Sequence, residues 1–482
     1  MLLRKLTLLF LLCSFFAQAQ NRKFVNLGTR EGLSQAEVSC ILKDRKGFFW
    51  CGTQDCLNRY DGYNFTVFRA DPDDPNSLSD NYINALFEDA DGRIFVGTNL
   101  GGLNVFDPVT NSFSHFKFNE DDPKSLADNR VHCILRDREG DLLVGTDKGL
   151  CIQKKGTKNF IRITAANDKP KGLMDGSIRY LLEDKSGNIW VGTFRGGLHL
   201  FHKKDLNFSY FPATEAGFSS VGEKANKIKT LYQDRNGIIW IGTFNGGLLK
   251  FDPEAKKYLA HFVSSLHPNS LSHDWINAIA EDAEGNLWLA TSDGGLCILD
   301  PVSETFSVQY ADELDPYGLK TNGLVSVYRD EANNMWLGTG NSGVNVFFRN
   351  TTKFNHYKKN HRTENTLPDN AVYNIYQDQN GIIWLCIKGH ELTRFDRANN
   401  QYQTFRDVCT ASNKTILSLY EDPNGIFWLG SFGGGISLFN PKTGKSLVNV
   451  EKDFKGPPFI NKTILEIKDD KEGNIWICTF GG

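Results

Sequence analysis

Hydrophobic and polar residues alternate along short stretches of this chain, and a turn signal ends each stretch. The stretch from Val38 to Leu42 alternates in period two, and an apolar stretch at 49–51 follows a turn at 44–47. Such alternation is typical of half-buried β-strands. An Asp followed three residues later by a Gly favours a tight turn, because Asp can bond its own turn and Gly tolerates positive φ. The pattern predicts a β-hairpin.

The same phrase recurs along nearly the whole chain. Its fullest form is Asp184-x-x-Gly-x-Ile-Trp190-x-Gly-Thr193, followed by a Gly-Gly-Leu turn that ends at Leu198. Ten copies are present, with their first Asp at Asp44, Asp89, Asp137, Asp184, Asp234, Asp282, Asp330, Asp378, Asp422 and Asp470, which are 44 to 50 residues apart. In the first copy we expect strands at 38–42, 49–51, 57–60 and 65–68, preceded by a short strand at 24–27.

Four strands per repeat predict an all-β chain of propeller blades. Propellers typically carry about four to eight blades, so ten copies do not suit one ring. We expect a seven-bladed β-propeller at 21–350, followed at 351–482 by an incomplete second propeller of about three four-stranded antiparallel blades. The boundary is placed where the repeat becomes irregular. Because residue 482 falls inside a turn, we expect the natural chain to continue.

The first twenty residues read as a signal peptide. Arg4 and Lys5 precede an apolar run from Leu6 to Phe16, and small residues follow where signal peptidase cuts. A membrane anchor is the less favoured alternative, because this run of eleven residues is short against the roughly 20 that span a bilayer. We expect export to the periplasm, with membrane attachment only through a segment beyond residue 482.

Tryptophan and cysteine follow the repeat. Eight of the nine Trp residues occupy the same repeat position, which predicts that they fill the core between neighbouring sheets. Cysteines also recur at fixed repeat positions, as at Cys40 and Cys133, and none shows metal-ligand spacing. We therefore expect mostly free, buried thiols.

A second phrase, rich in Pro, Asp, Asn and Ser around a central Leu, connects one copy to the next. It occurs around Leu78, Leu126, Leu271 and Leu367. We predict a structural connector in which the Leu plugs the sheet. The alternative, a calcium site, lacks the spacing of a known calcium loop.

Charge and motifs exclude several classes of function. The 54 Lys and Arg residues nearly balance the 57 Asp and Glu residues, giving a net charge of −3, so no direct contact with nucleic acid is expected. The sequence has no His-Glu-x-x-His, no Gly-x-Ser-x-Gly and no phosphate-binding loop. We predict no catalytic residue, no cofactor and no metal site.

The opening phrases Gly32-Leu-Ser-Gln35 and Leu57-Asn-Arg-Tyr60-Asp-Gly62, together with the ten repeats, resemble the two-component regulator propeller family. One departure is Cys56, which stands where the family usually has Gly, so the turn at 55–56 is expected to differ. The resemblance implies two tandem seven-bladed propellers outside the inner membrane. An immunoglobulin-like domain, a membrane helix, a histidine kinase and often a receiver and a DNA-binding domain would follow.

The resemblance also implies a function. This chain would be the ligand-sensing region of a hybrid sensor histidine kinase, a homodimer when complete, that binds an oligosaccharide and regulates glycan-utilisation genes. Two alternatives remain. One is a secreted propeller lyase or glycosidase whose paired carboxylates leave no linear motif. The other is a non-signalling carbohydrate-binding or scaffold propeller.

Candidate ligand-binding residues come from the turns before Gly-Gly. If the first strand of each repeat is innermost, these turns and the connectors share one face, and loops on a rigid scaffold commonly carry binding residues. The candidates are Asn99, Lys148, Phe194, Arg195, Phe244, Asn245, Asp293 and Phe432. Phe rings can stack on sugars, and Arg or Lys can pair with sulfate or carboxylate. The alternative is that the Phe residues only pack between blades.

Overall fold

The computed structural model describes residues 22–166, 171–216, 222–312 and 314–349, and then 357–359, 365–389, 391–397, 399, 401–406, 408–409, 415–449, 461–470 and 472–481. The predicted signal peptide lies outside these residues. The chain divides into two compact units, Met1–Thr351 and Thr352–Gly482. Within the described residues, no helix combines the length and the hydrophobicity needed to cross a bilayer.

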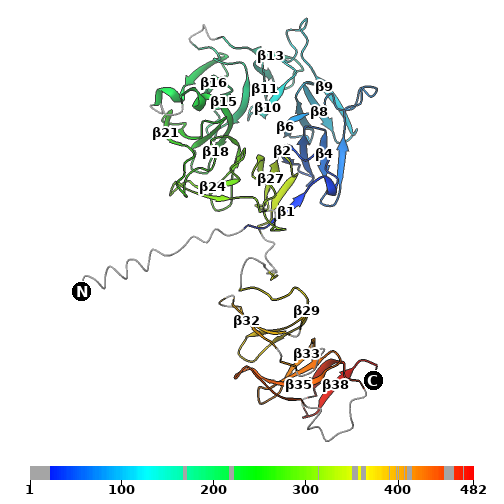
Figure 1. Cartoon of the computed structure of the whole chain (residues 1–482). Coiled ribbons are helices and arrows are strands. Elements are labelled where there is room, and N and C mark those ends of the chain that lie inside the picture. The colour runs from blue at the N-terminus through cyan, green and yellow to red at the C-terminus, as the bar shows by residue number, and fades with distance from the viewer. Residues whose placement is uncertain are drawn as a thin grey trace, which may run out of the picture. The chain divides into compact units, whose positions relative to one another are not determined.

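The first unit consists of seven four-stranded antiparallel sheets (Figure 1). Six of the sheets each contain four strands that are consecutive in the chain. The first three are β2(Val38–Lys43), β3(Phe49–Thr53), β4(Leu57–Tyr60), β5(Phe65–Phe68); β6(Ile83–Glu88), β7(Ile94–Thr98), β8(Leu103–Asp107), β9(Ser112–Phe116); and β10(Val131–Arg136), β11(Leu142–Thr146), β12(Leu150–Gln153), β13(Phe160–Ile163). The next three are β14(Ile178–Glu183), β15(Ile189–Thr193), β16(Leu198–His202), β17(Asn207–Phe211); β18(Ile228–Gln233), β19(Ile239–Thr243), β20(Leu248–Asp252), β21(Lys257–Phe262); and β22(Ile276–Glu281), β23(Leu287–Thr291), β24(Leu296–Asp300), β25(Thr305–Gln309). Short 3-10 helices lie at Thr29–Glu31, Ala213–Ala216 and Gly222–Asn226.

The seventh sheet closes the ring with a strand from the other end of the unit. It contains β26(Leu324–Arg329), β27(Met335–Thr339), β28(Val344–Phe347) and, as its fourth strand, β1(Phe24–Leu27). The strand at 24–27 was predicted, but its partner was not. β1 pairs antiparallel with β28, from Phe24 opposite Phe347 to Leu27 opposite Val344. The first strand of each sheet contacts the first strand of the next, and β26 contacts β2, so these strands are innermost.

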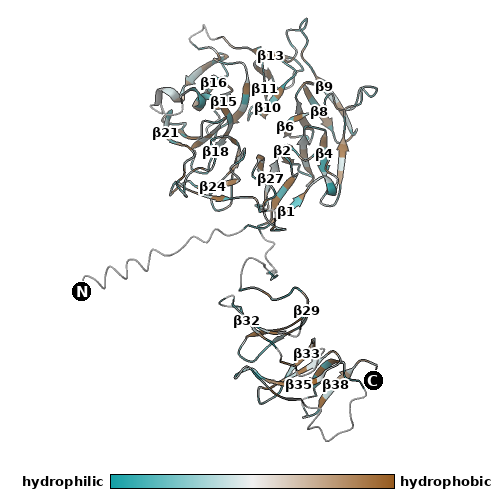
Figure 2. Cartoon of the chain, in the orientation of Figure 1, coloured by the Kyte–Doolittle hydropathy of each residue, from teal (hydrophilic) through white to brown (hydrophobic). Residues whose placement is uncertain are grey.

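The core lies between neighbouring sheets, and hydrophobic residues are concentrated along the strands (Figure 2). One cluster joins Trp190 and Leu200 of the β14–β17 sheet to Ile228, Ile239 and Phe251 of the next sheet. The repeated Trp therefore fills the gap to the following sheet, as the sequence predicted. An aromatic residue at this position fixes the spacing of two stacked sheets.

The repeat Asp fixes both the turn and the Trp. In the fourth sheet, Asp184 Oδ1 accepts hydrogen bonds from the backbone N–H of Ser186 and Asn188. Its Oδ2 accepts the indole N–H of Trp190 at 2.8 Å. The same indole bond, at 2.8 to 3.3 Å, is made by Trp50, Trp240, Trp288, Trp336, Trp384, Trp428 and Trp476. Sequence reasoning identified this Asp only as a turn former.

Two turn residues other than Gly have positive φ. Asn333, which replaces the turn Gly of the seventh copy, has φ of 63°, and Cys56 has φ of 105°. Cys56 thus keeps the left-handed conformation of the Gly it replaces, which corrects the expectation that Cys at this position changes the turn. Its backbone N–H donates to Asn81 O at 2.8 Å, which holds the turn against the next connector.

The connectors behave as structural plugs. Leu78, Leu126, Leu271 and Leu367 are all at most 4% exposed, and Leu173 plays the same part in a connector that the sequence analysis did not include. Isolated parallel bridges tie four of these Leu residues back to the end of the preceding sheet, for example Phe118 to Leu126.

The second unit contains two four-stranded sheets and one two-stranded sheet. They are β29(Val372–Gln377), β30(Ile383–Ile387), β31(Glu391–Asp396), β32(Gln401–Phe405); β33(Ile416–Glu421), β34(Phe427–Ser431), β35(Gly435–Asn440), β36(Lys445–Asn449); and β37(Ile464–Asp469), β38(Ile475–Thr479). Packing between them repeats that of the first unit, since Trp384 lies in a cluster with Phe427 and Phe439. That these sheets begin a second propeller stays a prediction.

Two expectations about burial are wrong at the last copy. Trp476 is 65% exposed rather than in the core, and Cys478 is exposed. The reason is that, in the described part of the chain, no sheet follows β38 to cover them. The other Cys residues from Cys40 onward are free and buried or half-buried, as predicted.

Candidate functional site

One face of the first unit is built jointly by the connectors and the turns before Gly-Gly. In the turns of the second to seventh blades, the first residue donates its backbone N–H to the connector residue that precedes the inner strand. Examples are Asp147 to Arg130 O, Phe194 to Ser177 O at 2.9 Å, and Phe244 to Lys227 O at 2.8 Å. This bond places the turn residues of successive blades at equivalent positions around the inner strands, with the first residue half-buried and the second exposed in the third to fifth blades.

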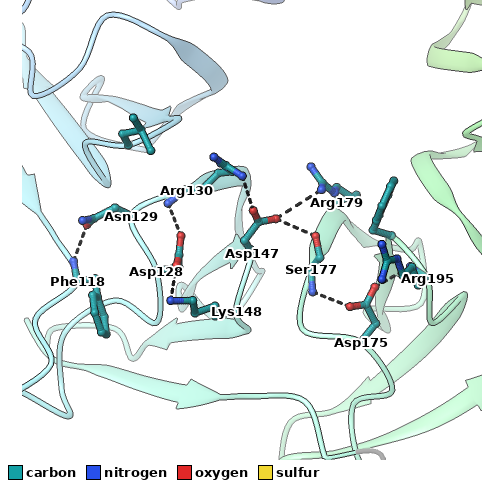
Figure 3. Close-up of a pocket in the computed structure, with 12 residues that line it drawn as sticks. Phe118, Asp128, Asn129, Arg130, Asp147, Lys148, Asp175, Ser177, Arg179 and Arg195 are labelled. Carbon is teal, nitrogen blue, oxygen red and sulfur yellow. Dashed lines mark hydrogen bonds and ion pairs between the residues drawn. The ribbon is translucent and has the colours of Figure 1, made fainter.

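A cavity of about 710 Å³ opens on this face over the second, third and fourth sheets (Figure 3). Its lining combines aromatic, cationic and acidic side chains. The lining residues are Leu100, Phe118, Asp128, Asn129, Arg130, Asp147, Lys148, Asp175, Ser177, Arg179, Phe194 and Arg195. A mixed polar and aromatic lining on a rigid frame suits a polar ligand with flat apolar faces, such as a sugar.

Asp147 is the centre of a hydrogen-bond network in this cavity (Figure 3). Its carboxylate accepts bonds from Arg130 Nη1 at 2.9 Å and from Ser177 Oγ at 2.8 Å, and Arg179 Nη2 lies 3.5 Å away. His132 Nε2 is 2.7 Å from Asp147 Oδ1. These partners, His132 first, hold the pKa of Asp147 far below its usual range.

His132 links Asp147 to Arg179. Burial lowers the pKa of His132 although Asp147 opposes this, so the imidazole is neutral at pH 7. Arg179 Nη1 donates to His132 Nδ1 at 3.3 Å. With Nδ1 accepting from Arg179, the neutral ring carries its proton on Nε2 and donates to Asp147. The network therefore fixes the Arg179 side chain beside the cavity.

Aromatic rings continue along the same face beyond the cavity. Phe194 meets Phe244 edge to face with ring centroids 5.0 Å apart, and Phe244 lies 5.4 Å from Trp275. The Arg179 guanidinium carbon lies 4.8 Å from the Phe194 ring centroid. Trp275, the one Trp outside the repeat position, is 37% exposed. Three successive blades thus present a row of aromatic rings.

The predicted site residues are only partly brought together. Lys148, Phe194 and Arg195 line the cavity. Phe244 belongs to the adjoining aromatic row; its contact with Phe194 shows that the expected packing between blades is also present. Asn99, Asn245 and Asp293 occupy the equivalent turns of other blades, and Phe432, 53% exposed, belongs to the second unit. Their part in binding stays a prediction.

Sequence reasoning missed the residues that the inner strands supply. Each inner strand has a register shift directly after its first residue, between Ile178 and Tyr180 in β14 for example. Such a β-bulge re-aims the extra residue. The extra residues in the third, fourth and fifth sheets are His132, Arg179 and Lys229. The signal available in the sequence was a single variable position directly after the first apolar residue of each inner strand.

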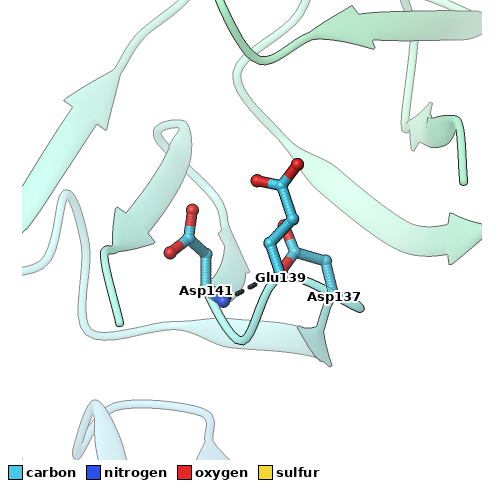
Figure 4. A group of neighbouring side chains, drawn as sticks. All are labelled: Asp137, Glu139 and Asp141. Atoms are coloured by element: carbon cyan, nitrogen blue, oxygen red, sulfur yellow. Dashed lines mark hydrogen bonds between the residues drawn. The ribbon is translucent and has the colours of Figure 1, made fainter. Parts of the chain in front are cut away.

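An acidic cluster of Asp137, Glu139 and Asp141 lies on a turn at the other end of the strands (Figure 4), and two lysine ammonium groups bond to it. Asp137, Glu139 and Asp141 bring their carboxylates within 4.8 Å of one another. Lys203 Nζ bonds all three, at 2.6 Å from Glu139 and Asp141, and Lys154 Nζ lies 2.8 Å from Asp141. Burial acts to raise the pKa of Asp141, but these lysines outweigh it and lower the pKa to about 2.

This cluster replaces a missing Trp. In the third copy Leu143 stands at the Trp position, so Asp137 has no indole donor. Lys203 of the following sheet bonds Asp137 Oδ2 in its place. In the second copy, where Phe95 replaces Trp, Arg93 bonds Asp89 Oδ2 at 2.6 Å. In both cases a cationic side chain supplies the hydrogen bond that the buried carboxylate would otherwise lack. The lysines therefore account for the gathering of the three carboxylates.

The connectors and turns that build this face lie within the segments that match a known protein family. The sequence model described as "Two component regulator propeller" matches residues 77–100, 125–148, 172–195, 222–245, 270–293, 366–388 and 410–433. Each match runs from a connector, through the inner strand, to a turn before Gly-Gly. The chain is a β-propeller repeat protein. Seven of its repeats belong to the two-component regulator propeller family.

Solved structures show the same fold. The extracellular domain of a hybrid two-component system from B. thetaiotaomicron is 21% identical with a TM-score of 0.63, covering 95% of this chain and 70% of that chain. The extracellular domain of a second such system from that organism is 20% identical with a TM-score of 0.54, covering 96% of this chain and 65% of that chain. At these identities the likeness is one of fold.

One curated relative matches a short segment. "Histidine kinase P4" of Formosa agariphila is 41% identical over 70 residues, which is 14% of this chain and 5% of that kinase. Virginiamycin B lyase from Staphylococcus aureus, 10% identical with a TM-score of 0.50, shares the propeller fold over 67% of this chain and 97% of its own. At 10% identity this likeness concerns the fold alone and not the lyase activity.

Proposed function

We propose that this chain is the extracytoplasmic ligand-sensing region of a hybrid two-component sensor histidine kinase. It binds an oligosaccharide derived from a polysaccharide, and kinase and DNA-binding parts carried beyond residue 482 regulate the genes for using that glycan. The family of the repeats supports the signalling class, and the named extracellular domains share the fold. The leader-like residues 1–20 support export to the periplasm. The complete receptor acts as a membrane-attached homodimer.

The observation that carries this proposal is the cavity on the connector and turn face. It joins half-buried Phe194 to the hydrogen-bonding groups of Arg179, Asp147 and Ser177. Sugar recognition needs both a flat apolar surface and fixed polar partners, and this site supplies them from rigid blades. Ser177 Oγ donates to the Asp147 carboxylate, and the low pKa of Asp147 makes this carboxylate a weak base.

The test is direct binding without turnover. Purified chain lacking residues 1–20 is titrated by calorimetry with oligosaccharides of defined length from several polysaccharides. We expect saturable binding of one class and no new reducing ends or unsaturated products. Phe194→Ala should weaken binding about tenfold or more, since a stacked aromatic contributes on the order of 1.5 kcal/mol.

Tyr63→Ala is the matched control. Tyr63 is 87% exposed on the turn between β4 and β5, at the opposite end of the strands from the cavity. Its loss should leave the affinity unchanged. Cleavage of a glycan by the purified chain would contradict the proposal and favour a propeller lyase or glycosidase.

A further inference from the structure

The face that carries the cavity has positive charges that the protein does not neutralise. Four cationic side chains line the cavity: Arg130, Lys148, Arg179 and Arg195. A fifth, Lys229, stands at the same bulge position in β18 as Arg179 in β14. The question is which of these charges already have partners.

The carboxylates of the cavity are committed to local bonds. Asp175 accepts the backbone N–H groups of Ser177 at 3.2 Å and of Arg195 at 2.6 Å. Asp128 accepts the backbone N–H of Arg130 and lies 3.3 Å from Lys148 Nζ. These carboxylates keep their negative charge, so the lining of the cavity sets four cationic side chains against three carboxylates.

Asp147 is shared among more cations than it can neutralise. One negative charge faces both Arg130 and Arg179, while His132 is neutral. The Arg195 guanidinium, on an exposed side chain, makes no ion pair among the described residues and lies 5.7 Å from the Phe194 ring. The cavity therefore keeps an excess of positive charge on its fourth-blade side.

Lys229 adds an uncompensated cation beside this excess. Among the residues that the structure describes, no carboxylate oxygen lies within 4.0 Å of Lys229 Nζ, so Lys229 makes no ion pair with them. Its Nζ lies 5.4 Å from the centroid of the Phe244 ring. Burial and the nearby Arg179 lower the pKa of Lys229 to about 8, although the charge of Glu37 opposes this shift. Arg179 shares Asp147 with Arg130, and Lys229 makes no ion pair among the described residues, so a bound anion beside them would offset the repulsion between the two cations.

We infer that the oligosaccharide bound at this site is acidic, with a sulfate or carboxylate group held between Arg179, Lys229 and Arg195. A sugar ring stacks on Phe194, and the aromatic row through Phe244 to Trp275 extends the contact to neighbouring sugars. This inference rests on the function proposed above and adds the charge of the ligand to it. Guanidinium groups suit the planar or multi-oxygen geometry of both anions.

The experiment compares acidic and neutral probes on the purified chain. Tetrasaccharides from alginate carry carboxylates, those from carrageenan carry sulfates, and those from laminarin are neutral. We expect at least one acidic probe to bind about tenfold or more tightly than the neutral one. Its affinity should fall as salt rises from low to physiological concentration, because salt screens a charge-assisted contact.

Lys229→Met gives a readout that a structural role would not. Removing an uncompensated half-buried charge should keep or raise the melting temperature. It should also weaken acidic-probe binding about tenfold or more, because the acidic group loses a hydrogen bond from a charged donor. Lys257→Gln, an exposed charge change on the outer strand β21, is the control and should alter neither quantity.

The outcomes separate the two proposals. If the neutral probe binds as tightly as the acidic ones and Phe194→Ala abolishes it, the sensing role stands and the acidic ligand is wrong. If acidic probes bind but neither Lys229→Met nor Arg179→Gln weakens them, the assigned site is wrong. If oligosaccharides of every class fail to bind, the proposed function itself is overturned.

Discussion

Each repeat Asp uses its two carboxylate oxygens for different purposes. Asp184 Oδ1 closes the turn through two backbone N–H groups, and Oδ2 holds the buried indole of Trp190. The turn and the core are thus coupled through one side chain that is 1% exposed. Where the indole is missing, Lys203 or Arg93 takes its place, which shows that the buried oxygen must have a donor.

At the residue scale, Asp184→Ala should destabilise the first unit by about 2–4 kcal/mol, because it removes two turn bonds and leaves the Trp190 N–H buried without an acceptor. Asp300→Ala is the comparison. Asp300 also bonds its own turn, at Val302 and Ser303, but it is only half-buried and accepts no indole N–H. Urea unfolding of the two variants measures the difference. Equal losses would show that the indole bond contributes nothing.

The closing strand is the element on which the ring depends. β1 supplies the outer strand of the seventh sheet, so the two ends of the unit are held together by one antiparallel pairing. Phe24 is 1% exposed and packs in the cluster that contains Trp288 and Met335, whereas Val25, on the other face of the strand, is 44% exposed. Ring closure therefore relies on two buried residues, Phe24 and Leu27, of a four-residue strand.

At the element scale, Phe24→Ala should lower the stability of the first unit by about 3–5 kcal/mol, as expected for deleting a buried aromatic side chain. Val25→Ala in the same strand should change stability by no more than about 0.5–1 kcal/mol. Thermal unfolding monitored by circular dichroism compares them. A small effect of Phe24→Ala would mean that the ring is held closed mainly by its inner strands.

The two units differ in how completely their sheets are covered. In the first unit every sheet has two neighbours; Leu181, for example, is 6% exposed and packs in a cluster with Leu143 of the preceding sheet. The equivalent residue of the second unit's first sheet, Ile375, is 69% exposed, and Trp476 of its last sheet is 65% exposed. These large apolar side chains, on the first and last sheets of the second unit, form exposed hydrophobic surface that favours association with other chains.

At the scale of the whole molecule, residues 22–351 expressed alone should be a monomer that unfolds cooperatively. Residues 352–482 alone should self-associate and bind a hydrophobic dye, because exposed sheet faces and edges pair with other chains. Light scattering after size exclusion checks both fragments, and Ile375→Lys should reduce the association of the second. A compact monomer of 352–482 would contradict this account.

The sequence by itself determined the repeat, the strands within it, the turn positions and the burial of the Trp and Leu residues. These follow from local periodicity and turn chemistry, which act over a few residues. Only the tertiary structure decided that β1 completes the seventh sheet, that Lys203 replaces an indole across a sheet boundary, and that the bulge residues Arg179 and Lys229 join the turns at one face. The Arg179–His132 bond links residues 47 positions apart, the Lys203–Asp137 bond 66 and the pairing of Phe24 with Phe347 323. Local pattern carries no information about which distant segments the ring brings together.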